Sequence, residues 1–102
     1  MTNERTEQIF NKDSLIKVLT EFLGDSEGAL TPENFSQHRS TIEKQIFPSA
    51  QGLGITTRDI RTDYDVELLQ SSHGPDRPSS GRLGYIKEHL RNLLERVKAY
   101  EG

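Results

Sequence analysis

The chain contains no cysteine and no tryptophan, only one methionine, and no apolar run that approaches the length of a membrane span. Without cysteine there is no disulfide framework, no thiol catalysis and no zinc site built on sulfur ligands. A transmembrane helix needs about 20 consecutive apolar residues, so we expect no contact with the membrane interior. Residues 1–8 are polar and lack the apolar core of a secretory signal peptide. We therefore expect a cytoplasmic protein.

Apolar residues are scarce as well, at 31% of 102 residues, and Leu, Ile, Val and Phe together supply only 25 positions. That share still lies above the roughly 20% below which charged chains tend to stay disordered. We expect one domain over residues 1–102, folded around a modest core. The net charge of −3 is uneven, because residues 1–35 carry −4 and residues 82–102 carry +2. This balance predicts no bulk attraction to nucleic acid or to anionic lipid.

Four helices are predicted from apolar spacing and from residues that start or stop helices. The first helix follows Asp13 as its N-cap and ends at Gly24. The second runs from Thr31 to Phe47, where Pro48 ends it. The third spans Thr57 to Gln70 and the fourth spans Leu83 to Tyr100. No alternating strand pattern of useful length competes. The predicted fold class is all-α, a small bundle of about four helices with a long amphipathic C-terminal helix. Residues 1–10 are predicted to form a flexible N-terminus, and residues 71–81, rich in Ser, Pro and Gly, a loop.

The last helix has the most regular pattern, a seam of apolar residues spaced alternately by three and four. Such a seam either packs inside a bundle or pairs with a second copy. Fewer than three heptads make a weak independent coiled coil, so the bundle is favoured. The alternative is a homodimer formed through Leu83, Ile86, Leu90, Leu93 and Val97.

Catalytic and metal-binding patterns are poorly represented. The three histidines, His38, His73 and His89, do not stand at metal-ligand spacing, and the chain has neither a G-x-S-x-G elbow nor a phosphate-binding P-loop. Residues 28–31 and Phe35 resemble the second half of an EF-hand loop, but the carboxylates that calcium needs at both ends are missing. We expect no enzyme, no cofactor and no bound metal.

One segment, residues 50–63, resembles the core of a helix-turn-helix DNA-binding motif. The resemblance is carried by a small residue, a turn glycine, apolar anchors and a hydroxyl cap, which are Ala50, Leu53, Gly54, Ile55, Thr56 and Ile60. It implies a DNA-binding transcriptional regulator in which Thr56 caps the recognition helix and side chains of that helix face the major groove. The DNA-binding candidates are Thr56, Thr57, Arg58 and Arg61. A capped turn between two bundle helices is the alternative interpretation.

The favoured prediction is a small non-catalytic helical protein-binding module, which would serve as an adaptor, an assembly subunit or an inhibitor of a partner protein. It follows from amphipathic helices, a low apolar content and an acidic N-terminal part. Acidic residues around the first interhelical loop are the predicted partner-binding patch, acting by electrostatic steering: Glu21, Asp25, Glu27 and Glu33.

Overall fold

The computed structural model describes residues 10–24, 29–70 and 78–100, and this part of the chain is helical without strands. Its elements are α1 (Lys12–Leu23), α2 (Phe35–Thr41), the π-helical turn η1 (Ile42–Ile46), α3 (Phe47–Leu53), α4 (Arg58–Leu69) and α5 (Ser80–Ala99). Because α2, η1 and α3 follow one another without a break, the described chain forms four helical rods. The predicted all-α bundle with a long C-terminal helix is confirmed.

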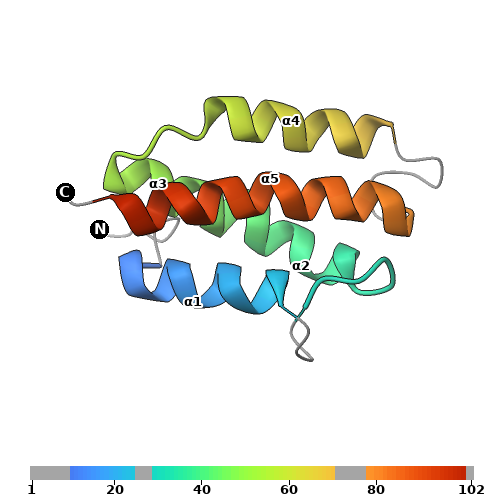
Figure 1. Cartoon of the computed structure of the whole chain (residues 1–102), viewed down its shortest axis with the longest axis horizontal. Coiled ribbons are helices and arrows are strands. Elements are labelled where there is room, and N and C mark those ends of the chain that lie inside the picture. The colour runs from blue at the N-terminus through green and yellow to red at the C-terminus, as the bar shows by residue number, and fades with distance from the viewer. Residues whose placement is uncertain (1–9, 25–28, 71–77, 101–102) are drawn as a thin grey trace, which may run out of the picture.

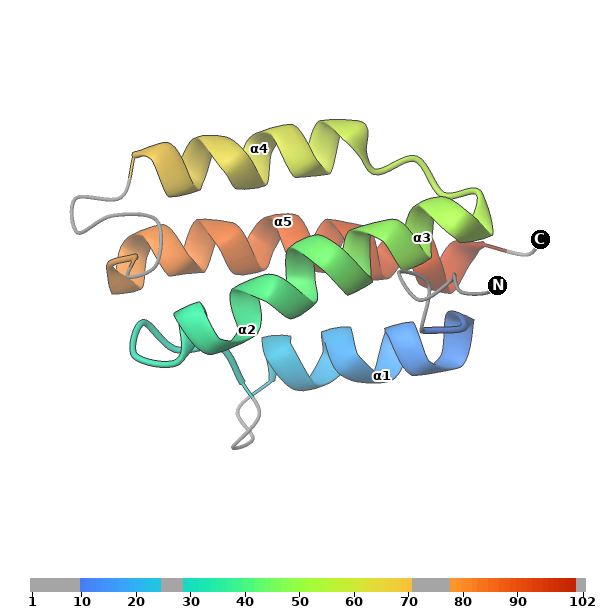
Figure 2. The ribbon, with the colours of Figure 1, turned by 180° about the vertical axis from the view of Figure 1, so that it is seen from behind.

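The four rods surround one core. Figure 1 shows α5 in front, with α4 along one side and α1 along the other. Figure 2, from behind, shows the rod made of α2, η1 and α3 crossing the back and closing the bundle. In both views α5 runs antiparallel to α1 and to α4, so each of its two long edges lies beside a different helix. No described helix is long and apolar enough to cross a membrane.

The seam of α5 is buried within a single chain. Ile86, Leu90, Leu93 and Val97 have no exposed surface and Leu83 keeps 4%. The seam therefore packs inside the bundle, as favoured from the sequence. A homodimer through these five residues would require the bundle to open, because α1, α4 and the rear rod already cover them. The helix also begins earlier than predicted, since Ser79 accepts a hydrogen bond from the Arg82 N–H and places Ser80 and Gly81 in the first turn.

Two predicted boundaries near the N-terminus are wrong. Asn11 rather than Asp13 caps α1, because the Asn11 side-chain oxygen accepts the Ser14 N–H at 2.8 Å, and Asp13 stands in the first turn. A carboxylate there still suits the positive end of the helix dipole. Phe10, predicted to belong to a flexible terminus, packs against the core, and its N–H donates to the Ser49 hydroxyl. Residues 1–9 of that predicted terminus lie outside the described residues.

Pro48 does not end the second helix as predicted. Proline cannot donate to the carbonyl four residues back, and its ring crowds that carbonyl. The helix accommodates this by widening into η1, where the Phe47 N–H donates to the Ile42 carbonyl five residues back. Helical structure then continues through α3 to Leu53. The widened turn explains how one rod spans residues on both sides of the proline.

The start of that rod and its end have clear causes. Thr31 and Asn34 exchange hydrogen bonds, each accepting the other's backbone N–H through a side-chain oxygen, so Thr31 has the predicted capping role although regular helix begins at Phe35. At the other end Gly54 adopts a φ of 100°, a left-handed conformation that favours glycine. A side chain there would also lie 3.3 Å from the Tyr100 hydroxyl.

Candidate functional site

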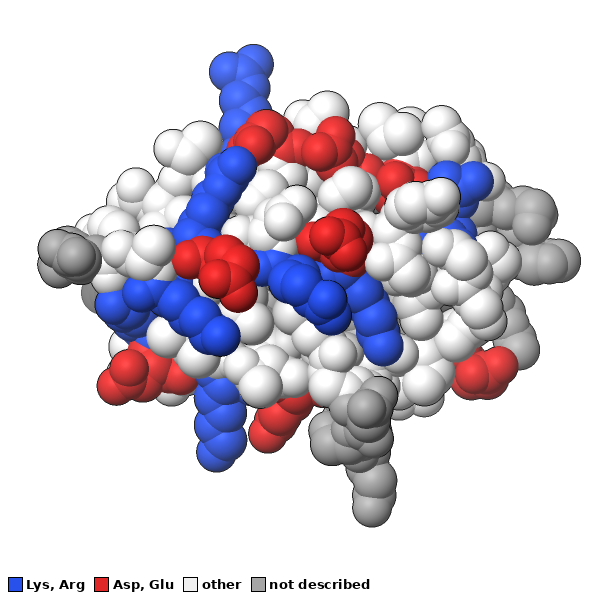
Figure 3. Space-filling view, in the orientation of Figure 1, with Lys and Arg blue, Asp and Glu red and all other residues white. Residues whose placement is uncertain are grey.

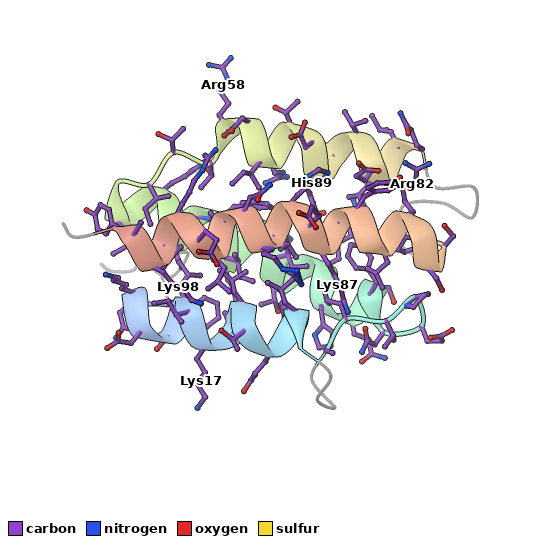
Figure 4. All side chains as sticks on the ribbon, viewed as in Figure 1. Lys17, Arg58, Arg82, Lys87, His89 and Lys98 are labelled. Atoms are coloured by element: carbon purple, nitrogen blue, oxygen red, sulfur yellow. The ribbon has the colours of Figure 1, made fainter. Side chains whose placement is uncertain are left out.

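The edge of α5 that faces α4 is joined to it by ion pairs. Arg96 forms a bidentate pair with the Asp59 carboxylate at 2.7 and 2.9 Å and also donates to the Thr56 carbonyl. Near the other end of α4, the Glu67 carboxylate accepts a hydrogen bond from Arg82 at 2.7 Å and lies 3.1 Å from the His89 ring nitrogen. These contacts tie the start of α4 to the end of α5 and the end of α4 to the start of α5. Figure 4 shows Arg82 and His89 on the side of α5 that faces α4.

The ion pairs shift the acidities of the groups that form them. The hydrogen bond from Arg96 lowers the pKa of Asp59 to about 2. Partial burial alone would raise the pKa of Glu67, but the hydrogen bonds from Arg82 and His89 outweigh it and lower that pKa. Both carboxylates are therefore held in the charged form at neutral pH. Their chemistry is that of structural anchors, since a general acid needs a pKa raised toward the working pH.

A second polar cluster joins the rear rod to α4. The buried Tyr64 hydroxyl donates to the Glu43 carboxylate at 2.9 Å, and Arg39 donates to the same carboxylate at 2.7 Å. Burial, followed by the charge of Glu43, raises the pKa of Tyr64, so its phenol stays protonated. The tyrosine ring packs edge-on against Phe47 at 5.5 Å. The π-helical turn, which carries Glu43, thus places a hydrogen-bond acceptor over the core.

An open recess of about 720 Å³ lies where α4 begins beside the end of α5. It is lined by Thr56, Arg58, Asp59, Thr62, Asp63 and Arg96. Arg96 and Asp59 neutralise each other there, which leaves one exposed arginine, Arg58, against one exposed aspartate, Asp63. The recess has no net charge to attract an anion. Figure 4 shows Arg58 pointing away from the bundle.

The four DNA-binding candidates do not form one outward surface. Thr57 is buried at 2% exposure, and its hydroxyl accepts a hydrogen bond from Gln51, so the prediction that it faces outward is wrong. Thr56 is exposed but does not cap α4, because Thr57 holds the N-cap position, without a side-chain bond. Arg61 lies against the Phe47 and Tyr64 rings and pairs with Asp65. Of the four candidates, only Arg58 is an exposed cation without an ion pair among the residues that the structure describes.

The predicted acidic patch is described in part. Glu21, in the last turn of α1, and Glu33, in the turn before α2, are both exposed. A hydrogen bond from the Leu30 N–H to the Phe22 carbonyl holds that turn against the end of α1. Asp25 and Glu27 lie outside the described residues. Figure 1 shows the turn before α2, which carries Glu33, at the end of the bundle where α4 ends and α5 begins, whereas α1, which carries Glu21 in its last turn, ends well short of that end.

An apolar surface at this same end was missed by sequence reasoning. Leu69 is 85% exposed, Val66 41% and Tyr85 59%, the three most exposed large apolar residues of the described chain. Arg82 contacts Tyr85, because its guanidinium lies 5.8 Å from the Tyr85 ring centre, and it also donates to Gln70 at the end of α4. We call Val66, Leu69, Arg82 and Tyr85 the α4–α5 face. Leu69 directly follows the buried Leu68, but its helical angle is far from that of the buried Ile60, Tyr64 and Leu68.

Among the described residues no group of three or more metal-ligating side chains is gathered in space. Comparison of the chain with protein-family models finds no match, and comparisons with curated proteins and with solved structures find none either. The functional argument therefore rests on the surface of this molecule alone.

Proposed function

We propose that the protein is a small non-catalytic helical module that binds another protein through the α4–α5 face. The observation that carries this is the exposure of Leu69, Val66 and Tyr85 on a bundle whose core is otherwise complete. Exposed apolar side chains gathered around an arginine and a tyrosine are typical of the centres of protein interfaces. None of the three is needed to bury the core, so a partner is the simplest reason for a chain poor in apolar residues to expose them.

The ion pairs behind the face support the same proposal. Glu67 holds Arg82 through a 2.7 Å bond, and Arg82 in turn supports the Tyr85 ring. A side chain held in place before binding loses less conformational entropy when the partner docks. The face is therefore a pre-formed surface on two helices, with Glu33 at the same end of the bundle as a steering charge for a partner with a basic rim.

Duplex DNA is the weaker alternative. Its supporting observation is the left-handed Gly54 between α3 and α4, which suits a helix-turn-helix connection. Against it, affinity for DNA comes largely from cations placed on phosphates. The start of α4 offers Arg58 alone, beside Asp59 and Asp63. The charges of this region favour a protein partner over DNA.

The decisive experiment changes the face without changing the core. A partner captured by the wild-type protein is purified, and its affinity is measured for the wild type, for Leu69→Ser with Tyr85→Ala, and for a control, Lys17→Ala with Lys44→Ala, on exposed residues elsewhere. We expect the face variant to lose about tenfold or more in affinity, as at interface centres, and the control to match the wild type. Unchanged affinity of the face variant would contradict the proposal. A duplex-DNA titration at low salt, lost in Arg58→Ala, would support the alternative instead.

A further inference from the structure

The opposite edge of α5, which faces α1, carries basic side chains that form no ion pairs with the described residues. Lys87, Arg91 and Lys98 stand on one flank of α5 at spacings of four and seven residues. Figure 4 shows Lys87 and Lys98 on the side toward α1, and Figure 3 shows Lys and Arg side chains in a band over the boundary between the two helices. Lys12 of α1 joins this band, because its ammonium donates to the Tyr100 carbonyl at the end of α5.

None of these four cations has an ion-pair partner among residues 10–24, 29–70 and 78–100. Glu88 and Glu95 stand three residues before Arg91 and Lys98 on α5, but neither forms an ion pair with them in the structure. Lys87, Arg91 and Lys98 extend over about 16 Å of α5, from the helical rise of 1.5 Å over the eleven residues between Lys87 and Lys98.

The same edge has an apolar side supplied by α1. Ile16 and Leu23 follow Lys12 at spacings of four and eleven residues, so all three lie on one flank of α1. Both are only partly buried and pack against the core, with part of each side chain left to solvent. We call this surface, formed by Lys12, Ile16, Leu23, Lys87, Arg91 and Lys98, the α1–α5 strip.

We propose that the α1–α5 strip binds an acidic amphipathic helix of a partner protein, a second interaction surface separate from the α4–α5 face. A helix laid antiparallel along α5 with carboxylates at spacings of four and seven residues would meet Lys87, Arg91 and Lys98 in turn, because the two helices share one rise per residue. Its apolar stripe would cover Ile16 and Leu23, as in helix-in-groove recognition. With the α4–α5 face at one end and the α1–α5 strip along one side, the module would join two partners.

The charge pattern selects a helix over nucleic acid and over a membrane. Glu88 and Glu95 border the cations along the whole strip, so a broad polyanion would be brought against carboxylates as well as against cations. A helix can place its carboxylates against the cations and its own lysines opposite Glu88 and Glu95. The chain's net charge of −3 further opposes a large anionic surface.

The test uses a designed acidic helical peptide as its probe, with glutamates at spacings of four and seven residues and leucines on the adjacent stripe. A scrambled peptide of identical composition is the control ligand. Affinities for the full-length protein are measured by fluorescence anisotropy at low and at raised salt. They are compared with those of Lys87→Glu/Arg91→Glu/Lys98→Glu and of the matched reversal Lys17→Glu/Lys44→Glu, with circular dichroism as the check on folding.

We expect the patterned peptide to bind the wild type more tightly than the scrambled one, and the triple reversal to weaken it by about tenfold or more, while the matched reversal has a smaller effect. Amide shifts in a ¹⁵N spectrum should concentrate on α1 and α5. Ile16→Ser, which leaves every charge in place, should weaken binding of the patterned peptide as well. Equal binding of the two peptides, no binding at low salt, or tighter binding of duplex DNA or phosphatidylserine vesicles to the same residues would overturn the proposal.

Discussion

The two long edges of α5 use charge in opposite ways. Toward α4, Arg82, His89 and Arg96 are all taken up by carboxylates of α4. Toward α1, Lys87, Arg91 and Lys98 have no such partners within the described chain. The two sets come from the same helix, and a shift of a few positions around its circumference separates them. The ion pairs between α5 and its neighbours thus lie on one edge, and the charges that we propose for recognition lie on the other.

The difference follows from the neighbouring helices. The flank of α4 that faces α5 presents Asp59 and Glu67, eight residues apart and so on one side of the helix. The flank of α1 that faces α5 presents Lys12, Ile16 and Leu23, none of which carries a carboxylate that could form an ion pair with a cation of α5. Exposed ion pairs contribute little stability, so the paired edge serves mainly to fix how α4 lies on α5. Burial of the seam between the edges supplies most of the stability.

The seam beneath both edges should therefore dominate any stability measurement. Leu90→Ala removes a fully buried side chain and should lower the free energy of unfolding by about 2–5 kcal/mol. Chemical denaturation followed by circular dichroism measures this. Leu69→Ala, on the exposed face, is the matched control and should change stability by less than about 0.5 kcal/mol. A similar loss in both variants would mean that Leu69 is covered by another part of the chain.

The paired edge should respond next. Glu67→Gln keeps the shape of the side chain but removes the charge that holds Arg82 and His89. We expect a loss of about 1 kcal/mol in the free energy of unfolding, because hydrogen bonds to charged groups are stronger than neutral ones but these groups are partly exposed. Arg91→Gln on the other edge is the control. An equal loss of stability in Arg91→Gln and in Glu67→Gln would contradict the difference between the two edges.

Acid titration gives a third, smaller effect on the same edge. The pKa of Asp59 is held at about 2, below its ordinary 3.8, so its pair with Arg96 stabilises the fold above pH 3.8 and loses that effect as the pH falls toward 2. Asp59→Asn removes this dependence. Stability measured from neutral pH to pH 2 should therefore fall less steeply in the variant than in the wild type. Parallel curves would show that the pair contributes nothing.

The unpaired edge should give the smallest effect of all on stability. Lys87→Ala with Lys98→Ala removes two cations that have no counter-charge in the described chain, so unfolding should change by less than about 0.5 kcal/mol. Thermal unfolding at low salt checks this. A more stable variant would indicate that like charges repel along the α1–α5 strip, which would sharpen the contrast between the two edges of α5. A clear loss of stability would show that these cations have structural partners.

Much of the fold could be predicted from the sequence because the core repeats at the period of a helix. The seam of α5 and the stripe of Ile60, Tyr64 and Leu68 in α4 are both buried as their spacing requires. Predictions failed where two local solutions compete. Asn11 and Asp13 can each cap α1, and Pro48 ends most helices, unless a π-helical turn such as η1 makes room for it.

The candidate sites were harder to predict, since they depend on which helices become neighbours. Arg96 and Asp59 are 37 residues apart, and only the packing of α4 on α5 brings them together. Leu69 is apolar, and no local signal distinguishes it from the buried Leu68 except its helical angle. The lack of ion pairs at Lys87 and Arg91 likewise depends on α1, which presents apolar residues to that edge of α5.

Hydrogen exchange on the single chain tests the central claim most directly, namely that α1, α4 and the rear rod bury the seam of α5 without help from a second copy. The amides of Leu90 and Leu93 should be among the slowest to exchange, and their protection should stay constant on dilution across concentrations at which sedimentation shows a monomer. Protection of α5 that falls as the protein is diluted would contradict the account, because a second chain would then be covering the seam.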